Sequence, residues 1–151
     1  MFKHTWAIFV VVTCANGAAW WVRGRSARAQ NPELTEGYRS LIQGWLVYAN
    51  LPWLFMGAGI VFGGVPSIFH YFDLRNGPWV TGWYAVVVGL WIATAYWVFL
   101  AGGAEALIRH PGLLNSTTQD PRAVKVLVGV ALVGGLAGLL MVLLGVAPSP
   151  R

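Results

Sequence analysis

Four long stretches without a charged side chain dominate the pattern along the chain. Asp, Glu, Lys and Arg are absent from residues 4–22, 40–72, 76–104 and 126–150. A transmembrane helix needs about 20 mostly apolar residues to cross about 30 Å of hydrocarbon, and each stretch can supply one. The pattern therefore predicts an all-α, polytopic membrane protein, a single integral membrane domain over residues 1–151 built as a four-transmembrane-helix bundle. The expected spans are residues 5–22, 42–64, 78–102 and 122–146.

Prolines predict where these helices begin, bend and end. Asn31-Pro32-Glu33 combines a cap, a first-turn proline and an acid, so a helix is expected to begin there and run straight into the second span. Pro52 removes a backbone donor inside that span, which predicts a kink. Pro66 is expected to end the helix. Further starts are predicted at Asn76-Gly77-Pro78 and Asp120-Pro121, and the third helix is expected to continue to Arg109.

Composition supports the membrane interpretation and excludes a water-soluble globular enzyme. The chain is 57% hydrophobic and only 10% charged, whereas a soluble domain is about 25% charged. Its single cysteine, Cys14, cannot form an intramolecular disulfide. Trp20, Trp21 and Arg23 stand where the cleavage region of a signal peptide would be small and neutral, so residues 5–22 are expected to form a retained helix.

The Lys and Arg residues predict an orientation. One side of the predicted membrane domain holds seven of them: Arg23, Arg25, Arg28, Arg39, Arg109, Arg122 and Lys125. The other side holds three: Lys3, Arg75 and Arg151. Because cytoplasmic loops carry the excess of positive charge, we expect a multi-pass protein of a bacterial-type inner membrane with both termini outside the cytoplasm. Loops 23–41 and 103–121 are then cytoplasmic, so the second helix extends on its cytoplasmic side. The net charge of +5 is explained by topology and by attraction to anionic lipid, and no nucleic-acid partner is expected.

Small residues recur at helix-packing intervals in three of the predicted spans. The pairs and triplets spaced by four are Gly59 and Gly63; Ala85, Gly89 and Ala93; Ala131 and Gly135; and Gly134 and Gly138. Such spacing lets helix backbones approach closely in lipid. Two interpretations stay open: the stripes pack the chain's own helices together, or the fourth span contacts a second chain, either another subunit or another copy.

Polar and aromatic residues at mid-span form a second candidate site. Trp53 and Trp91 lie deep in their spans, as do the amides Asn16 and Asn50. An amide in hydrocarbon needs a hydrogen-bonding partner, which predicts either bonds between helices or a midplane pocket for a quinone, carotenoid or lipid. The candidate ligand-binding residues are Asn16, Tyr48, Asn50, Trp53, Trp91, Thr94 and Tyr96.

The three histidines divide between the two predicted surfaces. His4, His70 and Asp73 are expected outside, where they are candidate metal ligands but lack ligand spacing, so interfacial positions explain them better than a metal site does. Glu105, Arg109 and His110 are expected at the inner surface. The first two are placed for an ion pair that ends the third helix, and the group is also a candidate docking surface.

Missing residue types narrow the function further. The apolar stretches hold no carboxylate, which argues against proton-coupled transport. Histidines at span ends do not suit haem, and no phosphate-binding loop or catalytic group is found, so we expect neither haem nor a nucleotide cofactor. The prediction is a structural, accessory or interaction subunit of an oligomeric membrane complex. The alternative is binding or passage of a small solute or apolar cofactor.

Overall fold

The computed structural model describes residues 3–114 and 119–144, and over these residues it is helical with no strand. Four of its helices are long and apolar enough to cross a membrane. They are α1 (Thr5–Arg23), α3 (Thr35–Val61), α4 (Pro78–Phe99) and α6 (Pro121–Leu143). The predicted all-α class and the four helices long and apolar enough to span a membrane are therefore confirmed over the described residues.

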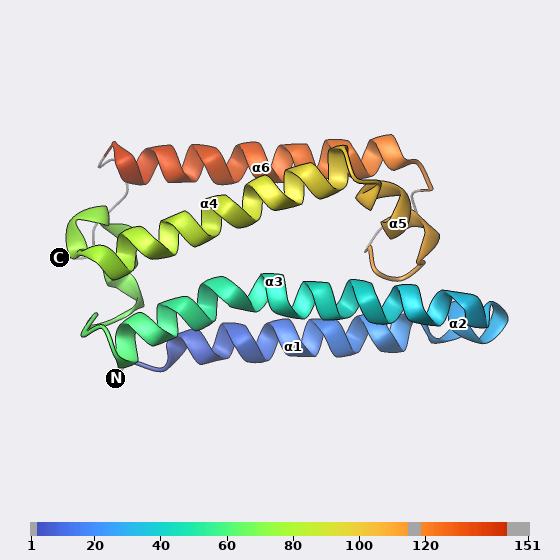
Figure 1. Cartoon of the computed structure of the whole chain (residues 1–151), viewed down its shortest axis with the longest axis horizontal. Helices are drawn as coiled ribbons and strands as arrows, with labels where there is room; N and C mark the ends of the chain where they lie inside the picture. The colour runs from blue at the N-terminus through green and yellow to red at the C-terminus, as the bar shows by residue number, and fades with distance from the viewer. Residues whose placement is uncertain (1–2, 115–118, 145–151) are drawn as a thin grey trace.

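Short elements connect the long helices. At one end of the molecule, α2 (Arg25–Gln30) and the 3₁₀ turn η1 (Pro32–Leu34) join α1 to α3, and α5 (Gly103–Arg109) joins α4 towards α6. At the other end, the 3₁₀ turns η2 (Ile68–Phe72) and η3 (Leu74–Asn76) join α3 to α4. Figure 1 shows α2 and α5 together at the right-hand end of the molecule.

The long helices are arranged as an open antiparallel row in the order α1, α3, α4, α6. Each helix packs on the next, and α1 and α6 form opposite edges of the view in Figure 1. Near its beginning α4 packs on α3 and η2, and near its end it packs on α5 and α6. A closed four-helix bundle is therefore not confirmed.

The ends of α3 follow from local backbone chemistry. The helix proper begins at Thr35, because Pro32–Leu34 forms a 3₁₀ turn first. It continues through Pro52 without interruption, so the kink stays a prediction. The helix ends at Val61, before the expected residue 64, and Gly64 with φ 72° turns the chain ahead of Pro66.

The expected continuation of the third helix to Arg109 is wrong. The helix α4 ends at Phe99, and Gly102 adopts φ 76°, a left-handed conformation that glycine accepts without steric cost. The chain then restarts as the separate α5. At the beginning of α4 the capping position belongs to Gly77 and not to Asn76. The carboxylate of Asp120 caps α6 as expected, accepting from the backbone N–H of Arg122 at 2.8 Å, and residues 145–146 of the fourth span lie outside the described residues.

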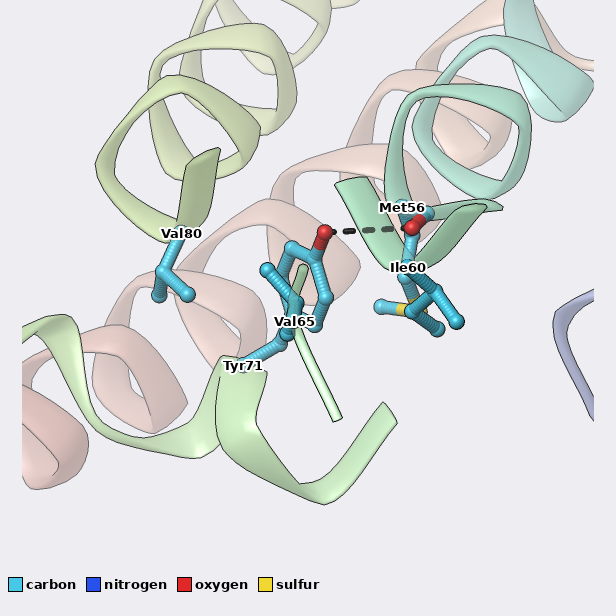
Figure 2. Packing of buried hydrophobic residues seen from close by; sticks show 5 residues of the cluster. All are labelled: Met56, Ile60, Val65, Tyr71 and Val80. Atoms are coloured by element: carbon cyan, nitrogen blue, oxygen red, sulfur yellow. Dashed lines mark hydrogen bonds between the residues drawn. The ribbon is translucent and has the colours of Figure 1, made fainter. Parts of the chain in front are cut away.

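Buried side chains form three small clusters spread along the row. The first cluster contains Met56, Ile60, Val65, Tyr71 and Val80, and Figure 2 shows the ring of Tyr71 between the end of α3 and the start of α4. Its hydroxyl donates to the backbone oxygen of Met56 at 3.1 Å. The second cluster contains Tyr38, Ile42 and Leu113, and the third contains Val98, Ala104 and Val124. Lipid can cover the remaining apolar surface, so a continuous core is unnecessary.

Candidate functional site

The seam between α1 and α3 contains a buried amide, Asn50. Its residue surface is 7% exposed, and its Nδ2 donates to the backbone oxygen of Leu46 at 2.8 Å. The sulfur of Cys14 on α1 lies 4.0 Å from the same nitrogen. The amide oxygen Oδ1 is buried and has no hydrogen-bond partner among the described residues. The amide nitrogen of Asn50 thus donates its stronger hydrogen bond to the backbone of its own helix, α3, and only a weak one to Cys14 of α1.

The other amide, Asn16, has a different environment. It lies on α1 and is exposed, and none of the hydrogen bonds described for the structure involves its side chain. The two amides therefore do not form one polar site.

The two deep tryptophans belong to separate helix pairs. The ring of Trp53 stacks on Phe9 of α1, with centroids 4.1 Å apart and 11° between planes. The ring of Trp91 lies against α6, where a Cβ at Gly135 would stand 2.8 Å from it. Tyr48 and Tyr96 are exposed, and Thr94 is half-buried. The structure does not bring the seven candidate ligand residues together.

A shallow apolar hollow lies on α4 and α6 instead. It has a volume of about 420 Å³, and its lining is formed by Phe99, Lys125, Val126, Gly129, Val130 and Val133. Lys125 gives it one charged border. The sequence pattern did not single out these positions, because an apolar lipid-facing helix offers no periodic signal that separates a hollow from a flat surface.

The small-residue stripes divide into packed and open positions. A Cβ at Gly59 would collide with the side chain of Tyr71, and a Cβ at Gly63 would collide with that of Trp79. The missing side chains of these two glycines therefore leave room for aromatic side chains of the same chain. Gly135 admits Trp91 in the same way. In contrast, within the described residues, and apart from the adjoining residues and the helix's own backbone, no heavy atom lies within 4 Å of a Cβ built at Gly89, Gly134 or Gly138. The alanines follow the same division: Ala85 and Ala131 are exposed, whereas Ala93 is half-buried.

The candidate docking residues Glu105, Arg109 and His110, at the end of the molecule that contains α2 and α5, have contacts that the sequence did not predict. His110 is 7% exposed, its Nδ1 lies 2.7 Å from the backbone oxygen of Ala106, and its ring meets Tyr38 edge-on at 4.9 Å. The surface position expected for His110 is therefore wrong, because the chain after α5 folds back against α3. The Tyr38 hydroxyl donates to the backbone oxygen of Pro111, which ties the two halves of the row together.

Glu105 pairs with Lys125 of α6 and not with Arg109. The Lys125 Nζ to Glu105 Oε1 distance is 3.1 Å, and Arg109 is exposed. Hydrogen bonds from the residue's own backbone N–H and from Lys125 lower the pKa of Glu105. The expected Glu105–Arg109 ion pair is wrong because α5 packs on α6, where Lys125 binds the Glu105 carboxylate instead.

The three candidate metal ligands His4, His70 and Asp73, at the end of the molecule that contains η2 and η3, have separate contacts. The Nδ1 of His70 is 3.1 Å from the Ser67 hydroxyl, and His4 is exposed before the first turn of α1. Asp73 binds Arg75 at 2.8 Å, and hydrogen bonds from that side chain lower the pKa of Asp73 to about 2. Within residues 3–114 and 119–144, no three His, Cys, Asp or Glu side chains are grouped for a metal.

Sequence reasoning counted Arg28 only as a topological charge and missed its contacts. Its guanidinium lies over the Trp21 ring at 3.7 Å and donates from Nη2 to the Trp21 backbone oxygen at 2.8 Å. A second ring, that of Tyr38, lies 5.2 Å from it. The seven-residue interval between Trp21 and Arg28, close to two helical turns, is a signal that could have indicated this contact, although the two residues lie in the successive helices α1 and α2.

No protein-family model, curated protein or solved structure matches this chain. The class defined by its own fold is a multi-pass helical membrane protein.

Proposed function

We propose that this chain is a structural or interaction subunit of an oligomeric complex in a bacterial-type inner membrane. The observation that supports this most is the pair of open glycines on α6, Gly134 and Gly138. Glycine inside a helix is less favourable than alanine by about 1 kcal/mol. Gly135 has a packing reason within the chain, whereas Gly134 and Gly138 have open space where a Cβ would stand.

The placement of α6 agrees with a binding surface. It is an edge of the row, and none of the most apolar window of this helix is buried inside the described structure. Small residues at a helix interface allow backbones to approach closely, which favours association in lipid. A helix of a neighbouring subunit packed along Gly134 and Gly138 gives these glycines the function that Gly135 has towards Trp91.

The proposed orientation has loops 23–41 and 103–121 in the cytoplasm and both termini outside. Its support is the excess of basic residues at the end that contains α2 and α5. Residues 115–118 of the second loop lie outside the described residues. Single-cysteine labelling from either side of intact cells, with Cys14 replaced by Ser, tests the orientation.

Native mass spectrometry of the chain extracted from its membrane tests the proposed function. We expect a defined oligomer or a stoichiometric second protein with wild-type chain, and its loss in Gly134→Ile and Gly138→Ile variants that keep the wild-type melting temperature. Gly44→Ile is the matched control, because Gly44 also has open space around it but lies on α3. A wild-type chain recovered alone contradicts the proposal.

A second candidate function is binding of an apolar ligand, and the hollow on α4 and α6 favours it. Its 420 Å³ volume and its lining suit one acyl chain, and Lys125 stands at its border. We expect a Gly129→Leu variant to lose a lipid that the wild-type chain retains through detergent. A quinone or carotenoid is distinguished from a lipid by its absorption spectrum.

A further inference from the structure

The exposed amide of Asn16 lies at a depth where lipid cannot satisfy it. Asn16 is seven residues from Arg23, the last residue of α1, and eleven from Thr5, the first. At 1.5 Å per residue these separations are about 10 Å and 16 Å along the helix axis. Asn16 is therefore well inside the hydrocarbon whichever way the chain is oriented.

The Asn16 side chain is too short to escape this environment. Lysine and arginine can extend their charged ends to the headgroups, but an asparagine amide reaches only a few ångströms from its helix. Two donors and one carbonyl acceptor are left facing hydrocarbon, and the described hydrogen bonds include none from this amide. An unsatisfied amide is costly in lipid, so the exposed position indicates a partner.

The surface around Asn16 suits a second helix. Ala15 and Ala19 are spaced by four and are both exposed beside it, so another backbone can approach closely. Phe9 and Trp20 mark the adjacent face of α1 that packs on α3, because Phe9 stacks on Trp53 and Trp20 meets Trp45 at 4.7 Å. Asn16 lies at the border of this seam with its own side chain exposed, so a second helix can reach the amide without displacing α3.

We propose that α1 pairs with α1 of a second copy of this chain through reciprocal Asn16 hydrogen bonds. This inference rests on the proposed function, since it names one partner and one surface of the oligomer. An amide contains donors and an acceptor in one group, so in two copies related by a twofold axis each Asn16 donates one N–H to the carbonyl oxygen of the other. The small side chains of Ala15 and Ala19 allow the two backbones to approach.

Disulfide cross-linking in membranes tests the proposed contact. Cys14 is first replaced by Ser, which removes the chain's only cysteine. We expect a cysteine introduced by Ala19→Cys to cross-link two copies efficiently. Ala18→Cys is the matched control, because Ala18 is exposed and adjacent in sequence but faces another direction on the helix.

Variants of Asn16 separate the amide from the surrounding surface. We expect Asn16→Ala to weaken dimerisation about eightfold or more, because the substitution removes both reciprocal hydrogen bonds between the two membrane helices. Asn16→Gln retains an amide and is expected to recover much of that loss. Because Asn16 is exposed, neither change is expected to alter the melting temperature of the monomer.

Several results would overturn the contact. One is equal cross-linking at Ala18 and Ala19, and another is dimerisation unaffected by Asn16→Ala. A third is an apolar carbonyl compound that co-purifies with wild-type chain and is lost in Asn16→Ala, which assigns the amide to a ligand. A stoichiometric second protein without α1 cross-links refutes this contact and leaves the proposed function standing, whereas a solitary monomer in native membranes refutes both.

Discussion

The helices α3 and α6 are both long, apolar and suited to spanning a membrane, yet they contribute very differently to the structure. Buried residues recur along α3: Tyr38, Ile42, Asn50, Met56, Gly57, Gly59 and Ile60. Among the described residues of α6 only Val124, close to its beginning, is buried. The helix α3 has neighbours on both sides, whereas α6 is an edge of the row (Figure 1).

The difference shows that hydrophobicity and burial are separate properties in this protein. In water, the most apolar helix is the one that must be buried. Lipid tails are as apolar as leucine, so α6 can stay exposed without a transfer cost. The helices of this chain pack together where glycines leave room for aromatic side chains and where a few hydrogen bonds form. Most of these glycines and hydrogen bonds involve α3.

One substitution made in both helices tests this contrast most strongly. In Gly57→Ala the new Cβ would stand 2.6 Å from the Trp6 ring, and such overpacking destabilises by about 1–3 kcal/mol. Gly138→Ala meets no atom within 4 Å, so the better helix propensity of alanine is expected to stabilise α6 by up to about 1 kcal/mol. Unfolding free energies in detergent, measured for both variants, check the opposite signs.

If Gly57→Ala and Gly138→Ala change the unfolding free energy in the same direction, the proposed contrast between α3 and α6 is wrong. Gly59→Ala provides an independent check on α3, because its Cβ would displace the Tyr71 hydroxyl from the Met56 carbonyl that accepts its hydrogen bond (Figure 2). A stabilised Gly59→Ala variant would show that α3 is no more tightly packed than α6.

A second test removes one buried hydrogen bond from α3. The hydroxyl of Tyr38 donates to Pro111, and Tyr38 is 0% exposed. Tyr38→Phe keeps the ring contacts with His110 and Arg28 but leaves a carbonyl without its donor, which is expected to cost about 1–2 kcal/mol. Thermal unfolding measures the loss. Tyr96→Phe on the exposed surface is the control and should not change the midpoint.

The sequence was sufficient to predict the spans but not the packing between them. Absence of charge is a property of each stretch by itself, and it located α1, α3, α4 and α6 within a few residues. The row arrangement depends on which faces meet, and the nearly uniform apolar surface of α6 carries little information about that. Gly102 breaks the helix before Arg109, and no local pattern distinguished this glycine from those that continue inside helices.

The contacts of the candidate site residues were predicted less well than the spans, because these contacts also depend on which helices meet. Trp53 and Trp91 both lie near the middle of their predicted spans. In the structure, however, Trp53 packs between α3 and α1, whereas Trp91 packs between α4 and α6. His110 looked like a loop residue because its burial depends on Tyr38, 72 positions earlier. Asn16 and Asn50 were both singled out as polar residues at mid-span, and only the structure shows that Asn16 is exposed while Asn50 is buried.

A third test concerns the ion pair beside the first turn of α6. Glu105→Gln removes the carboxylate that accepts from Lys125 and retains a side chain of similar size. We expect a small decrease in melting temperature that disappears in about 1 M salt, where exposed charges are screened within about 3 Å. Glu36→Gln is the matched control, because Glu36 pairs only with Arg39 of its own helix. Equal salt-dependent losses in both variants would contradict a role for Glu105 in holding α6.

The smallest expected effect is at the link between α3 and α4, where Asp73 binds Arg75. The pKa of Asp73 is lowered to about 2 from an ordinary value of 3.8, chiefly by the side-chain hydrogen bond from Arg75. A carboxyl group with a lowered folded-state pKa stabilises the fold above its unfolded pKa, and that contribution is lost as the pH falls through the folded value. Asp73→Asn can still cap the Arg75 backbone N–H but cannot form the ion pair. We therefore expect the melting temperature of Asp73→Asn to lie slightly below that of the wild type at pH 5, and the two to converge between pH 4 and pH 2. A difference that persists at pH 2 would assign the effect to the turn geometry and not to the charge.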